Sequence, residues 1–405
     1  EFPQRAVAQV RLARKLSGEL ARLQKVALNM ILPELSALTN VAEFHEMFEV
    51  SVVEGGARIP AESRCNLRVA LLQEELNELA TAIKDKDLVE CADAFADLQY
   101  VLAGAVLEFG LHRQFKAVFD EVHRSNMTKA CATQEEAVAT VLHYKGIGIE
   151  SEIRRSGVAD KITVHRVPDG KCLKSVQYSA PRLRDLLQSP PSEVNISEAS
   201  VGVPEPSCLT SVAAFHSLFY GPVAGDYPCI PPARSCSLQV ALLQEELDEL
   251  KQAIKTKDIV AAADAFADFQ YVLSWSVQEF GLHHRFDSIF AEVHRSNLSK
   301  ACKTKDEAEA TVQHYARSKH VQSEIKESAF APGKFLVNRI PDKKVLKSVN
   351  YSPPQLHDLV HRRTTEQGKE SETPEKLTLK RAAEACDQND ASRKNVRVSA
   401  PTASV

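Results

Sequence analysis

Acidic side chains recur at helical spacing in two nearby segments. In LLQEELNELA (residues 71–80), Glu75 and Glu78 are three positions apart, and in DAFADLQYVL (93–102), Asp93 and Asp97 are four apart. Both spacings place side chains on one face of a helix. The two aspartates interrupt an otherwise apolar segment, where ionised carboxylates are costly unless a cation neutralises them. Oxygen ligands without His or Cys favour Mg²⁺, with Mn²⁺ as an alternative. The sequence therefore predicts a metal site, although glutamates on helices more often form a solvated stripe.

The same pattern occurs a second time in the chain. Residues 71–131 and 242–302 align without a gap, with roughly two positions in three identical. The predicted metal ligands are Glu75, Glu78, Asp93 and Asp97 in the first copy, and Glu246, Glu249, Asp264 and Asp268 in the second. Glu90 is a possible additional ligand, whereas the second copy has Ala261 at this position. Glu74 and its counterpart Glu245 are the candidate catalytic residues, because a carboxylate next to the ligands could orient or deprotonate a water molecule.

A third repeated pattern could bind a nucleotide. In VHRSNMTK (122–129), Asn126 and Lys129 combine an amide that can contact a base or sugar with an ammonium that can hold a phosphate. The alternative is a basic helix end that only complements the helix dipole. The predicted nucleotide-binding residues are Asn126, Lys129, Arg124, Asn297 and Lys300, with Lys171 and Lys174 from PDGKCLKS. We expect Asn126 and Lys129 to act beside Glu75, Glu78, Asp93 and Asp97. His45 and His216 are interpreted as core or capping residues.

Helices must position these residues. The period of Leu72, Leu76 and Leu79 indicates one helix, the apolar run from residue 93 indicates a buried second helix, and KDKD (84–87) is a turn short enough for an antiparallel hairpin. Gly110 and Gly281 are expected to end the second helix of each copy. Further helices are expected over about 115–129 and 133–144, and ITVHRVPDGKCLKSVQY (162–178) has the pattern of a β-hairpin. The predicted fold is all-α, with two tandem helical-bundle modules, each carrying a small C-terminal β-hairpin.

The repeat also sets the domain organisation. We expect a helical N-terminal extension (1–40), a first module (41–187), a linker rich in Pro and Ser (188–211), a second module (212–360) and a disordered polar tail (361–405). The N-terminal extension contains arginines and lysines and little acid. This composition fits either a solvated helix or the remnant of an organelle transit peptide.

Composition excludes several classes of protein. The net charge of −4 argues against a nucleic-acid partner, and the chain has no apolar stretch long enough for a membrane span. The nine cysteines are scattered and form no CxxC motif, which argues against both a disulfide framework and a zinc ribbon. We expect a cytoplasmic protein, with organelle import as the alternative.

The order of the motifs resembles a known family. QEELNELATAI, ADAFADLQYVL, VFDEVHRSNMTK and PDGKCLKS together are similar to the MazG-like, phosphoribosyl-ATP pyrophosphohydrolase-like all-α nucleotide pyrophosphohydrolases. The resemblance implies Mg²⁺-dependent hydrolysis between the α and β phosphates of a nucleoside triphosphate, which would suit cleansing of the nucleotide pool. The family's ExxE motif maps to Glu75 and Glu78, and to Glu246 and Glu249. Its ExxD motif is changed in both copies if its Asp is Asp97, since Ala94 lies three positions before it. A literal ExxD occurs at Glu90 and Asp93, but its counterpart in the second copy, Ala261 to Asp264, lacks the Glu.

The resemblance also implies dimers or tetramers whose sites draw on neighbouring chains. We therefore expect the two modules to pair within one chain, with a homodimer as a possible further assembly. One alternative function is a nucleotide-binding pseudoenzyme or regulatory scaffold with an inactive second module, in which Gln239 replaces Arg68 and Trp275 replaces Gly104. A di-iron carboxylate bundle is a third reading, but the Glu-x-x-His pairs that it requires do not accompany these helices.

Overall fold

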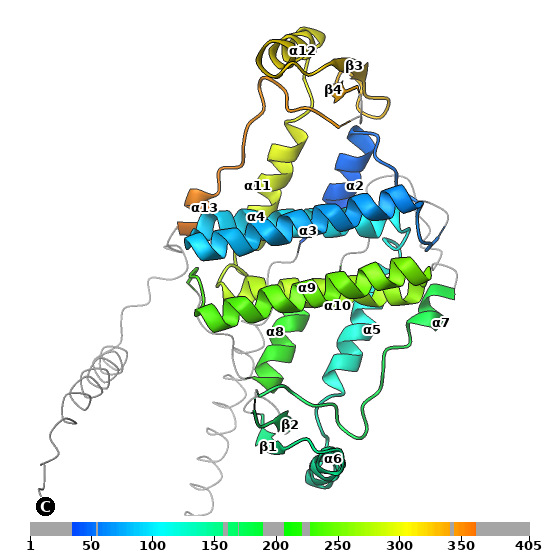
Figure 1. Ribbon diagram of the computed structural model, residues 1–405, viewed down its shortest axis with the longest axis vertical. Coiled ribbons are helices and arrows are strands. Elements are labelled where there is room, and N and C mark those ends of the chain that lie inside the picture. The colour runs from blue at the N-terminus through cyan, green and yellow to red at the C-terminus, as the bar shows by residue number, and fades with distance from the viewer. Residues whose placement is uncertain are drawn as a thin grey trace, which may run out of the picture. The chain divides into compact units, whose positions relative to one another are not determined.

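The computed structural model describes residues 35–53, 56–156, 161–168, 170–188, 206–220, 227–340 and 344–361 (Figure 1). Most of the expected N-terminal extension and of the linker, and all of the expected tail after residue 361, lie outside these residues. The first copy contains α2 (Ala37–Met47), α3 (Glu62–Asp85), α4 (Leu88–Glu108), α5 (Phe115–Met127), α6 (Gln134–Gly146), β1 (Ser151–Arg155), β2 (Ile162–Arg166) and α7 (Leu183–Gln188). The second contains α8 (Cys208–Phe219), α9 (Ala233–Thr256), α10 (Ile259–Glu279), α11 (Phe286–Leu298), α12 (Lys305–Lys319), β3 (Ser323–Glu327), β4 (Phe335–Arg339) and α13 (His357–His361). The predicted all-α fold with small hairpins is confirmed.

Local sequence explains the long helix hairpins. Lys86 ends α3 in the left-handed conformation with φ 59°, and the carboxylate of Asp87 accepts hydrogen bonds from the backbone N–H groups of Val89 and Glu90 at the start of α4. This is a C-cap followed directly by an N-cap, so the chain reverses within the predicted KDKD turn. Gly110 follows α4 at φ 68°, where a Cβ would lie 2.5 Å from the carbonyl oxygen of Gly56. The second copy repeats both features.

The β-hairpins differ from the prediction. The segment after Pro-Asp-Gly was expected to supply the second strand, but β2 pairs instead with β1, which lies upstream of it. Beyond the turn, Cys172 forms only an isolated bridge to His165. The alternation of β2 correctly identified one strand, but SEIRR (151–155) is too polar and too short to be recognised as its partner from periodicity alone.

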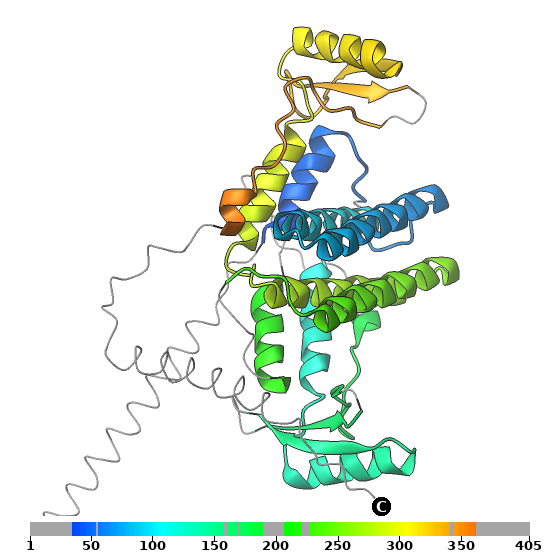
Figure 2. The same ribbon diagram turned by 60° about the vertical axis from the view of Figure 1, so that its left-hand side comes forward.

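The two copies exchange helices. Helix α3 contacts α9 and α4 contacts α10, so the two hairpins lie face to face (Figures 1 and 2). Helix α5 of the first copy packs on α10 and α8 of the second copy, and α11 of the second copy packs on α4 and α2 of the first. Phe95 meets Phe280 edge-on, with 4.9 Å between ring centroids, and Phe109 meets Phe266 in the same way. The copies therefore share one apolar core.

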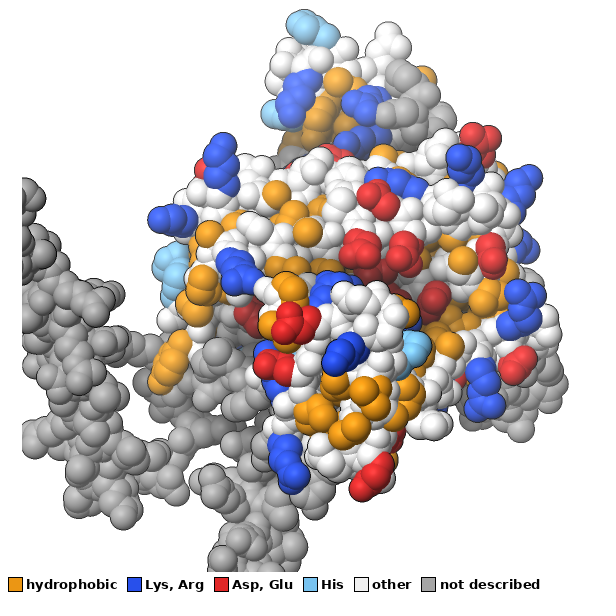
Figure 3. Space-filling model, turned by 60° about the horizontal axis from the view of Figure 1, so that its bottom comes forward, with side chains coloured by type: hydrophobic (Ala, Val, Ile, Leu, Met, Phe, Trp, Pro, Cys, Tyr) orange, Lys and Arg blue, Asp and Glu red, His pale blue; other side chains and the backbone are white. Residues whose placement is uncertain are grey.

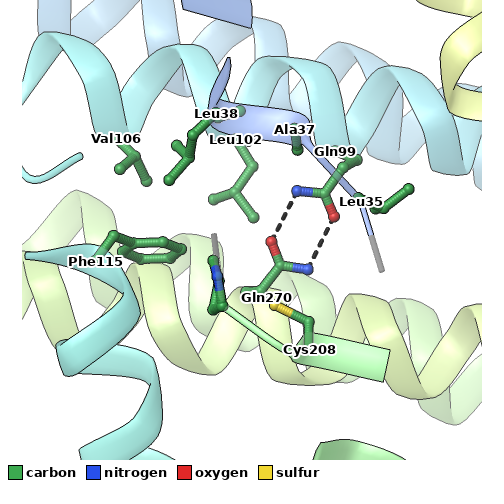
Figure 4. Close-up of a pocket in the computed structure, with 11 residues that line it drawn as sticks. Leu35, Ala37, Leu38, Gln99, Leu102, Val106, Phe115, Cys208 and Gln270 are labelled. Atoms are coloured by element: carbon green, nitrogen blue, oxygen red, sulfur yellow. Dashed lines mark hydrogen bonds between the residues drawn. The ribbon is translucent and has the colours of Figure 1, made fainter. Parts of the chain in front are cut away.

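Two pairs of glutamine side chains join the hairpins at corresponding positions. Gln99 and Gln270 exchange two buried hydrogen bonds of 2.8 Å across the contact between α4 and α10 (Figure 4). Gln73 and Gln244 exchange two partly buried hydrogen bonds between α3 and α9, at 2.9 and 3.2 Å. Each pair joins residues 171 positions apart, so each amide bonds to its own counterpart in the repeat.

The outer ends of the copies differ in surface. Hydrophobic side chains gather on the end that carries α6, which Figure 3 brings forward. Val138, Leu142 and Ile147 are exposed there. The corresponding positions in the second copy hold Glu309, Gln313 and Ser318.

Candidate functional site

A large cleft of about 1090 Å³ lies between elements of the two copies. The first copy supplies the walls from α2, α3 and α4. The second copy supplies α11 and the segment after β4. The predicted residues and their neighbours in this lining are Glu75, Glu78, Asp93, Asp97, Asn297 and Lys300, joined by Lys344, Lys347 and Tyr351. Carboxylates of one copy thus face the amide and ammonium groups of the other.

The carboxylates of this cleft hold their protons unusually tightly. Burial, reinforced by the charge of Asp97, raises the pKa of Glu75 to about 8. Burial also raises the pKa of Asp97 to about 7, with Asp93 adding repulsion, and that of Asp93 to about 6, with Glu90 and Glu78 adding repulsion. A buried oxygen of Asp93, Oδ1, has no hydrogen-bond partner. Such unpaired, mutually repelling oxygens fit the donor set of a hard divalent cation.

The side chains are not gathered into a closed ligand cage. Within the part of the chain that the structure describes, no group of three His, Cys, Asp or Glu side chains is arranged so that it could hold a metal ion as it stands. Like charges repel, so a spread arrangement is expected of carboxylates that share no cation. The fit to a cation therefore rests on the chemistry and burial of the oxygens, because the structure shows no coordination geometry.

The second copy supplies the positive charge of the first cleft. Burial lowers the pKa of Lys300, and the nearby Asp97 opposes this shift. The Lys300 ammonium donates to Asn297 Oδ1 at 2.7 Å and lies 5.9 Å from the ring centroid of Phe44 in the first copy. Lys347 lowers the pKa of both Asp93 and Asp97. These lysines lie where they could neutralise a phosphate group held against the carboxylates.

The second set of carboxylates has the reciprocal arrangement. Burial and neighbouring charges raise the pKa of Glu246 to about 8 and that of Asp268 to about 7, and Glu246 Oε2 and Asp264 Oδ1 have no hydrogen-bond partners. Lys129 of the first copy lies beside Asp268. The expectation that Lys129 acts beside the first copy's carboxylates is therefore wrong.

The exchange of helices is the reason for this correction. Helix α5, which carries Asn126 and Lys129, packs on α10 instead of on α4. Lys171 and Lys174 lie near Lys129, since the charges of both lower its pKa. Lys174 also lowers the pKa of Asp264, so these lysines belong with the carboxylates of the second copy.

Other predicted residues lie outside the large cleft. Glu74 is exposed on α3 and is absent from the lining. Glu90 is exposed in the first turn of α4 and influences the cleft only through its charge on Asp93. Glu245 lines a shallow depression on α9, together with Asp248 and Glu249.

Arg124 has a structural contact in place of the expected nucleotide contact. Its guanidinium pairs with Glu121 at 2.7 Å and donates to the carbonyl oxygen of Ala180 at 3.1 Å. It therefore holds the segment after the hairpin against α5. Arg295 repeats this arrangement with Glu292 and the carbonyl oxygen of Pro353.

Sequence reasoning missed two groups of residues in the cleft. Lys344 and Lys347 were not singled out, although the alignment of IPDKKVLKS with VPDGKCLKS pairs them with Lys171 and Lys174. The aromatic wall of Phe44 and Tyr100, whose rings meet edge-on at 5.5 Å, was also missed. Neither residue type in this position has a sequence signal that distinguishes it from an ordinary core residue.

Comparison with known proteins adds a family to this geometry. The chain is 43% identical over 75 residues to an uncharacterized protein of Acanthamoeba polyphaga mimivirus, covering 18% of this chain and 30% of the viral protein. The chain thus matches less than a third of that relative's length. No solved structure matches. Over the described residues, no helix combines the length and apolar character needed to cross a membrane. Residues 41–126 and 212–297 each match the phosphoribosyl-ATP pyrophosphohydrolase family, so the chain contains two tandem matches to this family.

Proposed function

We propose that the protein is a divalent-cation-dependent nucleoside triphosphate pyrophosphohydrolase, which cleaves between the α and β phosphates and releases a nucleoside monophosphate and pyrophosphate. One observation carries this proposal: four carboxylates of one copy, among them Asp93 with a buried oxygen that has no hydrogen-bond partner, share a cleft with lysines of the other. The match of both copies to a family named for pyrophosphohydrolysis supports the same reaction class. The sequence of the viral relative adds no information on the substrate, because that protein is uncharacterized.

The division of labour follows from the positions of the charges. Glu75, Glu78, Asp93 and Asp97 would hold Mg²⁺, or Mn²⁺ in its place. The bound cation would neutralise phosphate charge and lower the pKa of a bound water molecule. Lys300, Lys344 and Lys347 would hold the phosphate chain from the opposite wall, and Asn297 would orient the sugar or base. Catalysis of phosphoryl transfer consists mostly of such positioning and charge stabilisation.

The central test removes one carboxylate charge from the cleft. We expect Glu75→Gln to lower kcat for pyrophosphate release by at least ~100-fold, because a lost ligand weakens both cation binding and substrate positioning. The assay measures pyrophosphate and monophosphate from a panel of standard and modified nucleoside triphosphates with Mg²⁺. Glu62→Gln, on the same helix but exposed and outside the cleft, is the matched control. Release of orthophosphate in place of pyrophosphate, or no turnover of any nucleotide, would refute the proposed reaction.

A second substitution tests the proposed role of Glu74 as the base. Its exposed position outside the cleft leads us to expect that Glu74→Gln lowers kcat by less than ~10-fold, whereas removal of a general base typically costs ~100-fold or more. The comparison is made at saturating substrate, with kcat measured across the same pH range for both proteins. A loss as large as that of Glu75→Gln would restore Glu74 as the base and would require α3 to rotate or the side chain to turn inward.

A further inference from the structure

The end of the first cleft that carries Arg68 contains a buried charged network. Arg68 donates to Glu108 Oε1 at 2.5 Å and to His45 Nε2 at 3.1 Å, and Arg64 donates to the same glutamate. Burial lowers the pKa of His45 to about 3, so its ring is neutral and can accept this hydrogen bond. Two guanidinium groups thus share one carboxylate, and the network carries an excess positive charge. Arg68 Nε is buried and has no hydrogen-bond partner.

Gly104 makes this arrangement possible. A Cβ at this position would lie 2.6 Å from Arg68 Nη1 and 3.1 Å from His45 Nε2. A large side chain at position 104 and an arginine at position 68 would therefore compete for the same space. Arg68 and His45 fill the space beside Gly104, and both also line the cleft. We call the part of the cleft lined by Phe44, His45, Arg68 and Tyr100 the first recess.

The second copy has a large side chain where the first has glycine, and no arginine beside it. Trp275 stands in place of Gly104, and Gln239 in place of Arg68. The indole ring lies 4.5 Å from the His216 ring and 6.0 Å from that of Tyr220, measured between centroids, and its N–H donates to Glu279 at 3.2 Å. Glu279 is the counterpart of Glu108, so an indole has replaced the arginine as its partner.

The other end of each site differs little between the copies. Both sites retain two glutamates and two aspartates at corresponding positions of the same helix faces. In each site burial raises the pKa of one glutamate, Glu75 or Glu246, while the other glutamate is exposed. Both sites also have a half-buried lysine from the opposite copy. The two sites therefore differ mainly at the end that carries Arg68 and Gly104 in the first copy and Gln239 and Trp275 in the second.

We propose that the two sites bind different ligands: the first takes a whole nucleoside triphosphate, with its base in the first recess, and the second takes a divalent cation with a pyrophosphate-like anion and no nucleoside. The inference rests on the proposed function for the nature of the ligand. Phe44 and Tyr100 line the same cleft and offer apolar contact to a planar base. The unpartnered Nε–H of Arg68 offers a donor to an acceptor on the base edge. In the second copy, the indole of Trp275 packs on the ring of His216, the counterpart of His45.

Titration calorimetry of the full chain with Mg²⁺ tests this division. The probes are a nucleoside triphosphate with a methylene group between its α and β phosphates, which cannot be cleaved there, and imidodiphosphate. We expect one nucleotide analogue per chain, with any second binding at least tenfold weaker. We expect two imidodiphosphates per chain, one of which the nucleotide analogue displaces.

Exchanging the residues between the copies provides matched variants. Arg68→Gln with Gly104→Trp installs the second copy's residues in the first cleft, and should weaken binding of the nucleotide analogue at least tenfold while two imidodiphosphates still bind. Gln239→Arg with Trp275→Gly should create a second nucleotide site. Retained binding of imidodiphosphate shows that each variant is folded, and the second variant tests the idea by a gain that misfolding cannot mimic.

The outcomes separate this inference from the proposed function. Two nucleotide analogues bound with equal affinity to the unmodified chain, or unchanged nucleotide binding in the Arg68→Gln, Gly104→Trp variant, would overturn the inference even if pyrophosphate is released. One nucleotide bound in the expected manner without any release of pyrophosphate would overturn the proposed reaction and leave the division of the two sites intact.

Discussion

The pKa values of Glu75, Asp93 and Asp97 are higher in the folded protein than in an unfolded chain, because burial and neighbouring negative charges both disfavour the ionised carboxylates. Their surroundings therefore do not stabilise the chain by themselves. A carboxyl group whose pKa is higher in the folded state binds more protons there than in the unfolded chain. Folding stability then falls as pH rises between the two pKa values. For Glu75 this interval extends from its ordinary value of 4.5 to about 8.

We accordingly predict that pH and divalent cations act on stability together. In EDTA, Tm should fall as pH rises from ~6.5 to ~8, above the range in which the buried histidines His45 and His216 oppose the effect, and Mg²⁺ should raise Tm more at the upper end, because it binds the ionised carboxylates. Thermal unfolding of the full chain across this range, with and without Mg²⁺, measures both effects. Glu75→Gln should reduce the slope in EDTA, whereas Glu62→Gln should not. A Tm that rises steadily with pH in EDTA would contradict this account of the carboxylates.

At the scale of elements, hydrogen bonds between corresponding residues of the two copies determine how the two helix hairpins align. The Gln99–Gln270 pair is buried, and each amide both donates to and accepts from the other. An amide can satisfy this geometry only if α4 and α10 are aligned at corresponding residues. The pair therefore favours the register in which each cleft receives the lysine of the opposite copy.

Substitution of this pair gives a test of its contribution. Gln99→Leu should destabilise the chain by about 1–3 kcal/mol, because the buried carbonyl oxygen of Gln270 then loses its donor, while its amide nitrogen keeps only the hydrogen bond to Ser274. The double substitution with Gln270→Leu should cost less than the sum of the two single substitutions, since no unpaired amide remains. Urea unfolding of the four proteins measures the coupling. Additive losses would mean that the two amides do not depend on each other.

Local signals in the sequence were sufficient for the helix hairpins but not for their exchange. The Lys86–Asp87 turn and Gly110 act on the backbone within a few residues, so their effects could be predicted. The apolar face of α5 has the same periodicity whether it packs on α4 or on α10. Its spacing therefore could not show that Lys129 lies beside Asp268. Likewise, the polar strand β1 carries little trace of its pairing with β2.

On the scale of the whole molecule, each cleft takes its carboxylates from one copy and its lysines from the other, and Tyr100 reaches across to His294 as Tyr271 does to His123. A single copy therefore has its carboxylates but not the lysines that face them. It would also expose the apolar faces that α4 and α10 bury in the shared core. Two identical copies could repair both defects by forming a symmetric dimer, since each surface is self-complementary.

A fragment of residues 35–188 should therefore be a dimer, in which each α5 places Lys129 beside Asp97 of the partner. Both of its clefts would contain Arg68 and Gly104, so we expect Mg²⁺-dependent pyrophosphate release that falls on dilution as the dimer dissociates. A fragment of residues 206–361 is the matched control, because it can form the same dimer but carries Trp275 in both recesses. Light scattering during gel filtration gives the mass, and nucleotide titration gives the number of sites. A first fragment that remains monomeric and turns over nucleotide as fast as the full chain would show that one copy completes its own cleft, contrary to the exchange of α5 and α11.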